Sequence, residues 1–116
     1  MKKIDPEILE SLARYDSATV QNAAAVVRGY IPAVLDYSGP GLRRLTSETA
    51  TVVGYAVTAE LTPLTEPLNK ISWEGYYDTM AYLDAPSIAV LKDADQPAGR
   101  GAILGDGMAY RHRALG

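Results

Sequence analysis

The stretch from Ala50 to Glu60 constrains the fold more than any other part of the sequence. It is rich in β-branched residues and tyrosine, and apolar side chains fall on both of its alternating faces. This pattern is typical of a strand that is covered on both sides, as in a parallel sheet. Gly54 within the stretch predicts either a bulge or a close approach of another backbone segment. We therefore expect Ala50–Glu60 to form a β-strand with both sides covered.

Two segments with helical features precede this strand. Pro6–Arg14 begins with a proline at a favourable first helical position. A second helix can be capped by Asp16 or by Ser17, and Gly29 is placed to end it. Tyr30–Leu45 has no periodicity and is predicted to be irregular.

Helical and strand patterns alternate in the second half of the chain. Aromatic and apolar residues repeat at helical spacing from Trp73 to Ala81, and the apolar run Ile88–Leu91 predicts a buried strand. A polar loop, Lys92–Gly101, precedes a last predicted helix at Met108–Leu115. This alternation predicts an α/β fold. Because a stable sheet usually needs three or more strands, we also expect the fold to be incomplete at its C-terminal end.

Composition limits the class of protein. The chain has 116 residues, of which 47% are hydrophobic and 22% charged, and this is typical of one soluble globular domain. It contains no cysteine, which excludes disulfides and thiolate chemistry, and its apolar runs are too short to cross a bilayer. No secretory signal follows the first methionine, and the net charge of −3 argues against nucleic acid as a partner. We expect a cytoplasmic protein with no membrane or nucleic-acid partner.

The stretch from Gly101 to Ala109 carries the clearest functional pattern. An apolar segment leads through Gly105, Asp106 and Gly107 directly into a helix that starts near Met108. Glycines allow positive φ angles and close approach to a ligand, and the free N–H groups of a helix start attract anions. The pattern predicts a site for a carboxylate or phosphate. The alternative is a glycine turn that only changes the direction of the chain.

Two side chains near this loop allow more than one interpretation. Asp106 could cap the helix, or it could face the anion site and hold a metal-bound water. His112 is the sole histidine of the chain, and a packed or solvated residue is the simpler interpretation than a catalyst, since no Ser–His–Asp arrangement is evident. Arg111 and Arg113 lie where they favour the helix dipole.

Three other groups of residues favour structural interpretations. Asp93 and Asp95 could form a metal pair, but they lack calcium-loop spacing and are interpreted as a solvated turn. Arg43–Arg44 could bind an anion or simply lie at the surface. The aromatic cluster Trp73–Tyr77 is expected in the core or at a subunit interface, and not as a stacking platform for bases.

Four motifs, in order, resemble those of one family. Tyr15–Ala23 resembles the opening helix pattern D-T-x-T-V-x-[DN]-A, and Val52–Thr58 is similar to a V-x-G-x-A-x-T strand. Ile88–Asp93 resembles V-V-V-x-D, and Gly105–Gly116 resembles G-E-x-x-A-x-x-H-x-A-L-G. These are motifs of the RraA-like, 4-hydroxy-4-methyl-2-oxoglutarate aldolase family, and the resemblance covers essentially the whole chain.

The resemblance implies a swivelling β/β/α sandwich, assembled as trimers or hexamers with active sites between subunits. It implies a divalent-metal-dependent lyase, with Mg or Mn as cofactor, that acts on pyruvyl (2-oxo acid) substrates such as 4-hydroxy-4-methyl-2-oxoglutarate or oxaloacetate. By position, Gly105, Asp106, Gly107 and Met108 would bind the substrate carboxylate, and Asp106 would be the catalytic residue that orients a metal-bound water. Some relatives instead bind and inhibit ribonuclease E.

One family motif is not found in these 116 residues. The segment D-G-x-[VI]-R-D, which supplies the substrate-binding arginine and the metal-binding aspartate, would follow Gly116, so no direct metal ligand is predicted within this chain. We therefore expect a truncated or split aldolase or decarboxylase that needs a complementing polypeptide. The alternative is a non-catalytic binding or assembly module.

Overall fold

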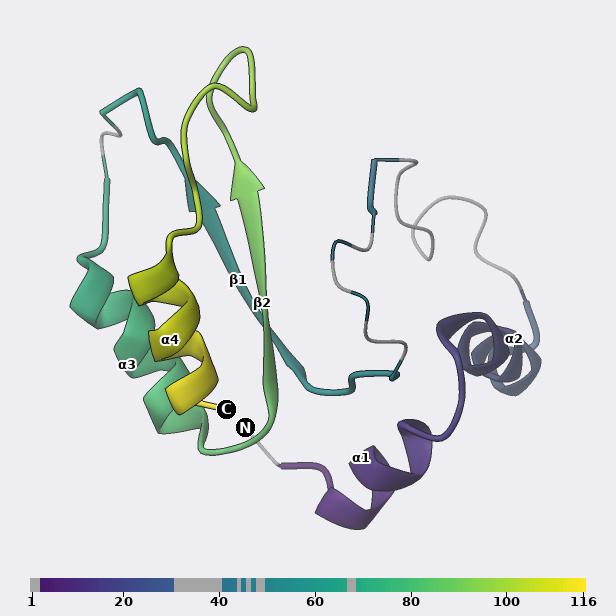
Figure 1. Ribbon diagram of the computed structural model, residues 1–116. Coiled ribbons are helices and arrows are strands. Elements are labelled where there is room, and N and C mark those ends of the chain that lie inside the picture. Colours follow the sequence, from purple (N-terminus) through teal and green to yellow (C-terminus); the bar gives the residue numbers. More distant parts are fainter. Residues whose placement is uncertain (1–2, 31–40, 44, 46, 48–49, 67–68) are drawn as a thin grey trace. The chain divides into compact units, whose positions relative to one another are not determined.

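The structure is a computed structural model that describes residues 3–30, 41–43, 45, 47, 50–66 and 69–116. These residues form a mixed α/β structure with four helices and a two-stranded parallel sheet (Figure 1). The chain divides into two compact units, Met1–Val53 and Gly54–Gly116. Most of the segment Tyr30–Leu45, predicted to be irregular, lies outside the described residues.

The first unit contains two helices whose ends follow local capping rules. Helix α1 spans Pro6–Leu12 and has proline in its first turn, as predicted. Helix α2 spans Ser17–Arg28, and its N-cap is Asp16, whose carboxylate accepts a hydrogen bond from the Thr19 amide at 2.7 Å. Gly29 ends α2 with a φ of +75°, a conformation that favours glycine. The predictions for both helices are therefore confirmed.

The second unit is a β–α–β arrangement followed by one more helix. Strand β1 (Tyr55–Leu61) pairs in parallel with strand β2 (Ser87–Asp93), and helix α3 (Trp73–Leu83) connects them. Helix α4 (Asp106–Ala114) follows a loop after β2 and lies beside α3 (Figure 1). Strand β1 is shorter than the predicted Ala50–Glu60, since residues 50–54 are not part of the sheet.

One face of the sheet packs against the helices. Val57 of β1 is buried with Tyr76 and Met80 of α3, and Leu91 of β2 and Leu115 pack against this cluster. In both strands the more buried residues alternate with exposed ones. The register places the more buried residues of β1 opposite the more buried residues of β2, and exposed residues opposite exposed ones. The core of this unit is therefore a single layer between the sheet and the helices.

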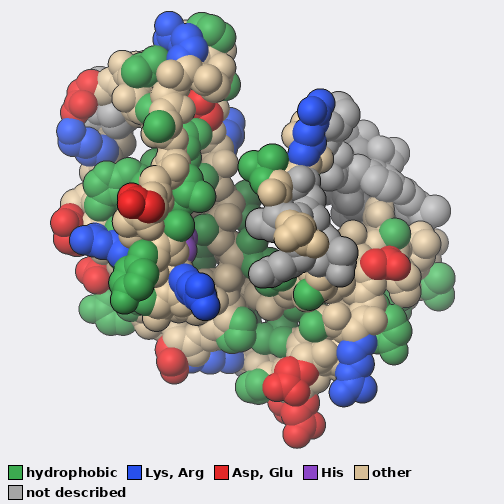
Figure 2. Space-filling model, in the orientation of Figure 1, with side chains coloured by type: hydrophobic (Ala, Val, Ile, Leu, Met, Phe, Trp, Pro, Cys, Tyr) green, Lys and Arg blue, Asp and Glu red, His purple; other side chains and the backbone are tan. Residues whose placement is uncertain are grey.

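Within the second unit the other face of the sheet is exposed, so the described residues of this unit do not form the predicted cover on both sides of the strands. Ile88 and Val90 of β2 are 37% and 51% exposed, and Ala56 and Thr58 lie opposite them on β1. Figure 2 shows other hydrophobic side chains at the surface of the visible face. The apolar composition of these strands predicts a second cover that the described residues of this unit alone do not provide.

Gly54 explains how the two strands meet at the start of β1. A Cβ atom at this position would lie 2.9 Å from the Pro86 carbonyl oxygen, closer than real Cβ contacts allow. The same oxygen accepts the first hydrogen bond of the ladder, from the Tyr55 amide at 2.8 Å. The predicted close approach of another backbone segment is confirmed.

The helices are short relative to a lipid bilayer. Within the described part of the chain, no helix is both long enough and apolar enough to cross a membrane.

Candidate functional site

The glycine-rich loop ends where α4 begins. Gly105 is the N-cap residue, with extended backbone (φ −108°, ψ 174°), and no side chain caps the helix. The Gly105 carbonyl accepts the first helical hydrogen bond, from Ala109 at 2.9 Å. Asp106 is the first residue of the helix, so its interpretation as the N-cap is wrong. An acidic residue in this turn still stabilises the helix, because its negative charge lies near the positive end of the helix dipole.

The N-cap residue of α4 is a glycine, so it has no side chain that could cap the amides of the first turn. The first N–H groups of any helix have no intrahelical acceptor. Asp106 and Gly107 are exposed, and the Asp106 carboxylate accepts a hydrogen bond from the Gly107 amide at 2.7 Å. Neither Gly105 nor Gly107 has a positive φ, and a Cβ at either position would meet no atom within 4 Å. The glycines leave open space beside the backbone but are not required by its conformation.

His112 is a packed residue that joins α4 to α3. Its Nδ1 lies 2.6 Å from the Met108 carbonyl oxygen, which can only accept a hydrogen bond. In the neutral ring the proton is therefore on Nδ1, and Nε2 accepts from the Tyr76 hydroxyl at 2.8 Å. Burial raises the pKa of the Tyr76 hydroxyl above its ordinary value, with a smaller contribution from Tyr77. With both ring nitrogens engaged, His112 serves packing, as the simpler interpretation of the sequence predicted.

Arg111 and Arg113 lie in the last turn of α4, as predicted. Their positive charges interact favourably there with the negative end of the helix dipole. The Arg111 guanidinium also lies 5.2 Å from the centre of the Tyr77 ring, within the range of a cation–π contact. Arg111 therefore adds a second link between α3 and α4.

The two aspartates after β2 organise the loop at the carboxyl end of the sheet. Asp95 is 1% exposed, and one of its carboxylate oxygens accepts a hydrogen bond from the Leu64 amide at 2.8 Å. Asp93 accepts hydrogen bonds from the amides of Asp95 and Gly99. The interpretation as a solvated turn is wrong for Asp95, because its carboxylate connects the loops that follow β1 and β2. The spacing of two aspartates after a buried strand did not reveal this role, which depends on Leu64, 31 residues away.

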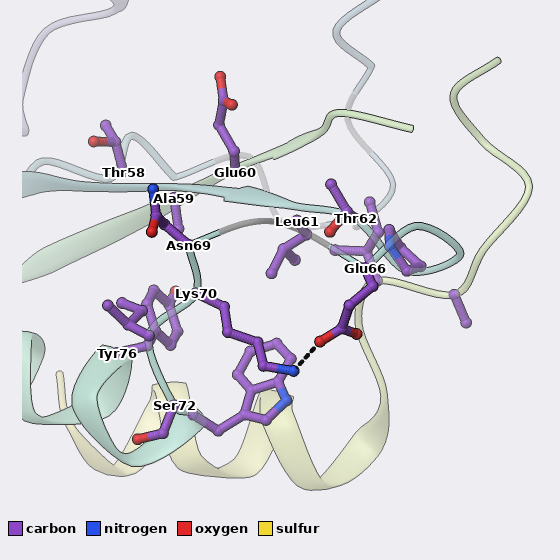
Figure 3. Close-up of a pocket in the computed structure, with 15 residues that line it drawn as sticks. Thr58, Ala59, Glu60, Leu61, Thr62, Glu66, Asn69, Lys70, Ser72 and Tyr76 are labelled. Carbon is purple, nitrogen blue, oxygen red and sulfur yellow. Dashed lines mark hydrogen bonds and ion pairs between the residues drawn. The ribbon is translucent and has the colours of Figure 1, made fainter. Parts of the chain in front are cut away.

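A pocket of about 690 Å³ lies beside the second half of β1 (Figure 3). It is lined by Thr58–Pro63, by Glu66, by Asn69–Trp73 with Tyr76, and by Ala102 with Ile103. None of the residues from Gly105 to Met108 is among those that line it. One sequence signal points to this pocket: Trp73, predicted to lie in the core or at an interface, is 45% exposed.

Comparisons with known proteins do not add a family to this description. No family model, no curated protein and no solved structure matches the chain. The resemblance to RraA-like aldolases therefore rests on the four sequence motifs.

Proposed function

We propose that the chain is an RraA-like aldolase or decarboxylase-type domain whose α4 start binds the carboxylate of a 2-oxo acid. Candidate substrates are 4-hydroxy-4-methyl-2-oxoglutarate and oxaloacetate. The observation that carries the proposal is the first turn of α4, in which the amides of Asp106, Gly107 and Met108 follow a glycine N-cap without a capping side chain. Such amides, together with the helix dipole, favour a bound carboxylate.

The Asp106 side chain has a defined place in this proposal. Its carboxylate already accepts the Gly107 N–H, which is one of the donors that a substrate carboxylate would use. A bound anion must displace the side chain, and two carboxylates at one helix end repel each other. We therefore expect removal of the Asp106 carboxylate to leave the binding of a simple 2-oxo acid intact or to strengthen it.

The divalent metal that the resemblance implies does not fit the described residues. They contain no group of three or more His, Cys, Asp or Glu side chains arranged to hold a metal ion. Mg²⁺ takes six oxygen ligands in near-octahedral geometry, and Asp106 offers one carboxylate. The described residues by themselves are therefore assigned carboxylate binding only, and a metal would need the ligands of the family's Arg-Asp segment.

We also propose that the sheet belongs to a swivelling β/β/α sandwich that assembles as trimers or hexamers or with a complementing chain. The exposed face of β2 supports this, because Ile88 and Val90 stay 37% and 51% exposed. Parallel sheets are normally covered on both faces, so a partner surface that buries these side chains would stabilise the unit.

A pair of variants at one position tests the carboxylate site. Asp106→Ala removes the side chain and keeps the amide, whereas Asp106→Pro removes both. Proline is favoured at the first helical position, and the extended backbone of Gly105 suits a residue before proline, so α4 should persist in both variants. We expect pyruvate to shift the amide NMR signals of residues 106–108, with Asp106→Ala binding at least as well as the native chain and Asp106→Pro several-fold more weakly. Equal binding by the two variants, or shifts elsewhere, would contradict the proposal.

The catalytic part is tested separately, by metal-dependent release of pyruvate from oxaloacetate. We expect the 116-residue chain to be inactive by itself and to gain activity when a polypeptide that carries the family's Arg-Asp segment is added. Because the resemblance gives Asp106 a catalytic role, Asp106→Ala should abolish that gain. Pyruvate binding without any gain would favour the alternative of a non-catalytic binding module.

A further inference from the structure

The pocket beside β1 presents the edge of a strand as well as side chains. The Tyr55 amide donates to the Pro86 carbonyl, and the Leu61 carbonyl accepts from the Ala94 amide, both at 2.8 Å. The odd-numbered residues of β1 therefore direct their backbone groups toward β2. Because successive residues of a strand direct their N–H and C=O groups to opposite edges, Thr58 and Glu60 direct theirs to the outer edge.

The side chains of Thr58 and Glu60 point away from the pocket, whereas Leu61 points toward it (Figure 3). Thr58 and Glu60 nevertheless line the pocket, so they must do so through their backbone. An extended residue offers its N–H and C=O side by side, one donor and one acceptor. No hydrogen bond to another described residue is found for these outer-edge groups. The pocket therefore contains paired hydrogen-bonding positions along one wall.

An aromatic surface forms another part of the lining. Trp73 lies against two tyrosines, edge-on to Tyr76 at 6.0 Å and stacked with Tyr77 at 6.2 Å between ring centroids. These contacts hold the indole in place while 45% of the residue remains exposed. Ile103 adds an apolar surface from the segment before α4. A flat ring is the ligand shape that such a wall accommodates best.

The charges around the pocket are internally compensated. Glu66 forms an ion pair with Lys70, and Glu60 forms one with Lys92, its partner in the ladder, at 2.6 Å. No uncompensated cation or anion among the described lining residues selects a charged ligand. A neutral ligand is therefore favoured over an ionised one.

We propose that this pocket binds a small, neutral, planar heteroaromatic molecule. Its ring packs on Trp73, and adjacent donor and acceptor atoms on its edge pair with the backbone of Thr58 or Glu60. A purely hydrocarbon ring would fill the apolar part but would leave these backbone groups unpaired, which is unfavourable. This site is independent of the carboxylate site at the start of α4.

Adenine is a suitable probe, because it is neutral near pH 7 and carries a donor beside an acceptor. N6,N6-dimethyladenine is the matched control ligand, since it keeps the ring and lacks that donor. Trp73 is the single tryptophan of the chain, so its indole N–H gives one assignable NMR signal. We expect adenine to shift this signal and the amides of Thr58 and Glu60 in a saturable manner, and dimethyladenine to bind at least fivefold more weakly.

Variants distinguish binding at this site from non-specific binding to exposed aromatic residues. Trp73→Leu should weaken adenine binding by roughly tenfold, as expected for a lost stacking partner, whereas Tyr82→Leu should not. Tyr82 lies on the same helix, is 86% exposed and does not line the pocket. If Trp73→Leu does not fold, Ala102→Phe provides a second test, because it adds bulk to the lining and should block binding. The proposal is overturned if the native chain shows no saturable shifts, if both ligands bind equally, or if adenine shifts residues 106–108 instead.

Discussion

Replacing Gly54 by alanine tests whether the close approach of two backbone segments limits the stability of the second unit. The new Cβ would lie 2.9 Å from the Pro86 oxygen, 3.0 Å from its carbon and 3.1 Å from the Ser87 carbon, all of them backbone atoms. Relief requires β2 to shift where the Tyr55 amide makes the first ladder hydrogen bond. Overpacking of this kind costs about 1–3 kcal/mol, and a weakened hydrogen bond adds up to about 1 kcal/mol. The less flexible unfolded chain offsets about 0.4–1 kcal/mol of this cost, so we expect a net loss centred on about 2 kcal/mol.

The assay is urea unfolding followed by the fluorescence of Trp73, which lies in the same unit. Gly107→Ala is the matched control, because a Cβ there meets no atom within 4 Å and alanine is the better helix former. We expect the unfolding midpoint to fall for Gly54→Ala and to stay level or rise for Gly107→Ala. A Gly54→Ala variant as stable as the native chain would refute the steric argument.

Four further outcomes follow from the packing and the titrating groups. Met80→Ala should lower the free energy of unfolding by about 2–5 kcal/mol, because Met80 is 2% exposed in the core. Tyr76→Phe should cost about 1 kcal/mol by leaving His112 Nε2 without its donor. Because the pKa of Tyr76 is raised in the folded state, the unfolded chain loses its proton first, so native stability should fall as pH rises above about 10, and Tyr76→Phe should lose that slope. Asp16 shows the opposite sign: the Thr19 amide lowers its pKa, so the helicity of α2 should fall as pH drops below about 4, and Asp16→Asn should flatten this change in circular dichroism.

Features that depend on a few neighbouring residues could be predicted from the sequence. Asp16 and Gly29 bound α2 because a cap needs only a carboxylate or a flexible backbone at the right position. Gly54 predicted a close approach because any larger residue would collide with the facing backbone. The α/β class could also be predicted, because the helix and strand patterns each depend on residues close together in the sequence.

Features that depend on distant residues could not be predicted. Whether Asp95 is solvated or buried depends on the Leu64 amide in another loop. The pocket arises where Trp73 meets the outer edge of β1 and Ile103, and no spacing in the sequence encodes that meeting. The exposure of Ile88 and Val90 could not be predicted, because apolar composition does not distinguish a side chain packed on a helix from one without a cover.

The ladder between β1 and β2 has a consequence for how the second unit folds. Every pair in the register joins residues 32 positions apart, from Tyr55 with Ser87 to Leu61 with Asp93. Asp95 and Leu64, 31 positions apart, close the same intervening segment at the far end of the ladder. The entropy of loop closure is therefore lost when the first of these contacts forms. Each later contact forms in a chain that is already constrained. The strands and α3 should accordingly open as one cooperative foldon, in which the amides directed between the two strands share a single level of hydrogen-exchange protection.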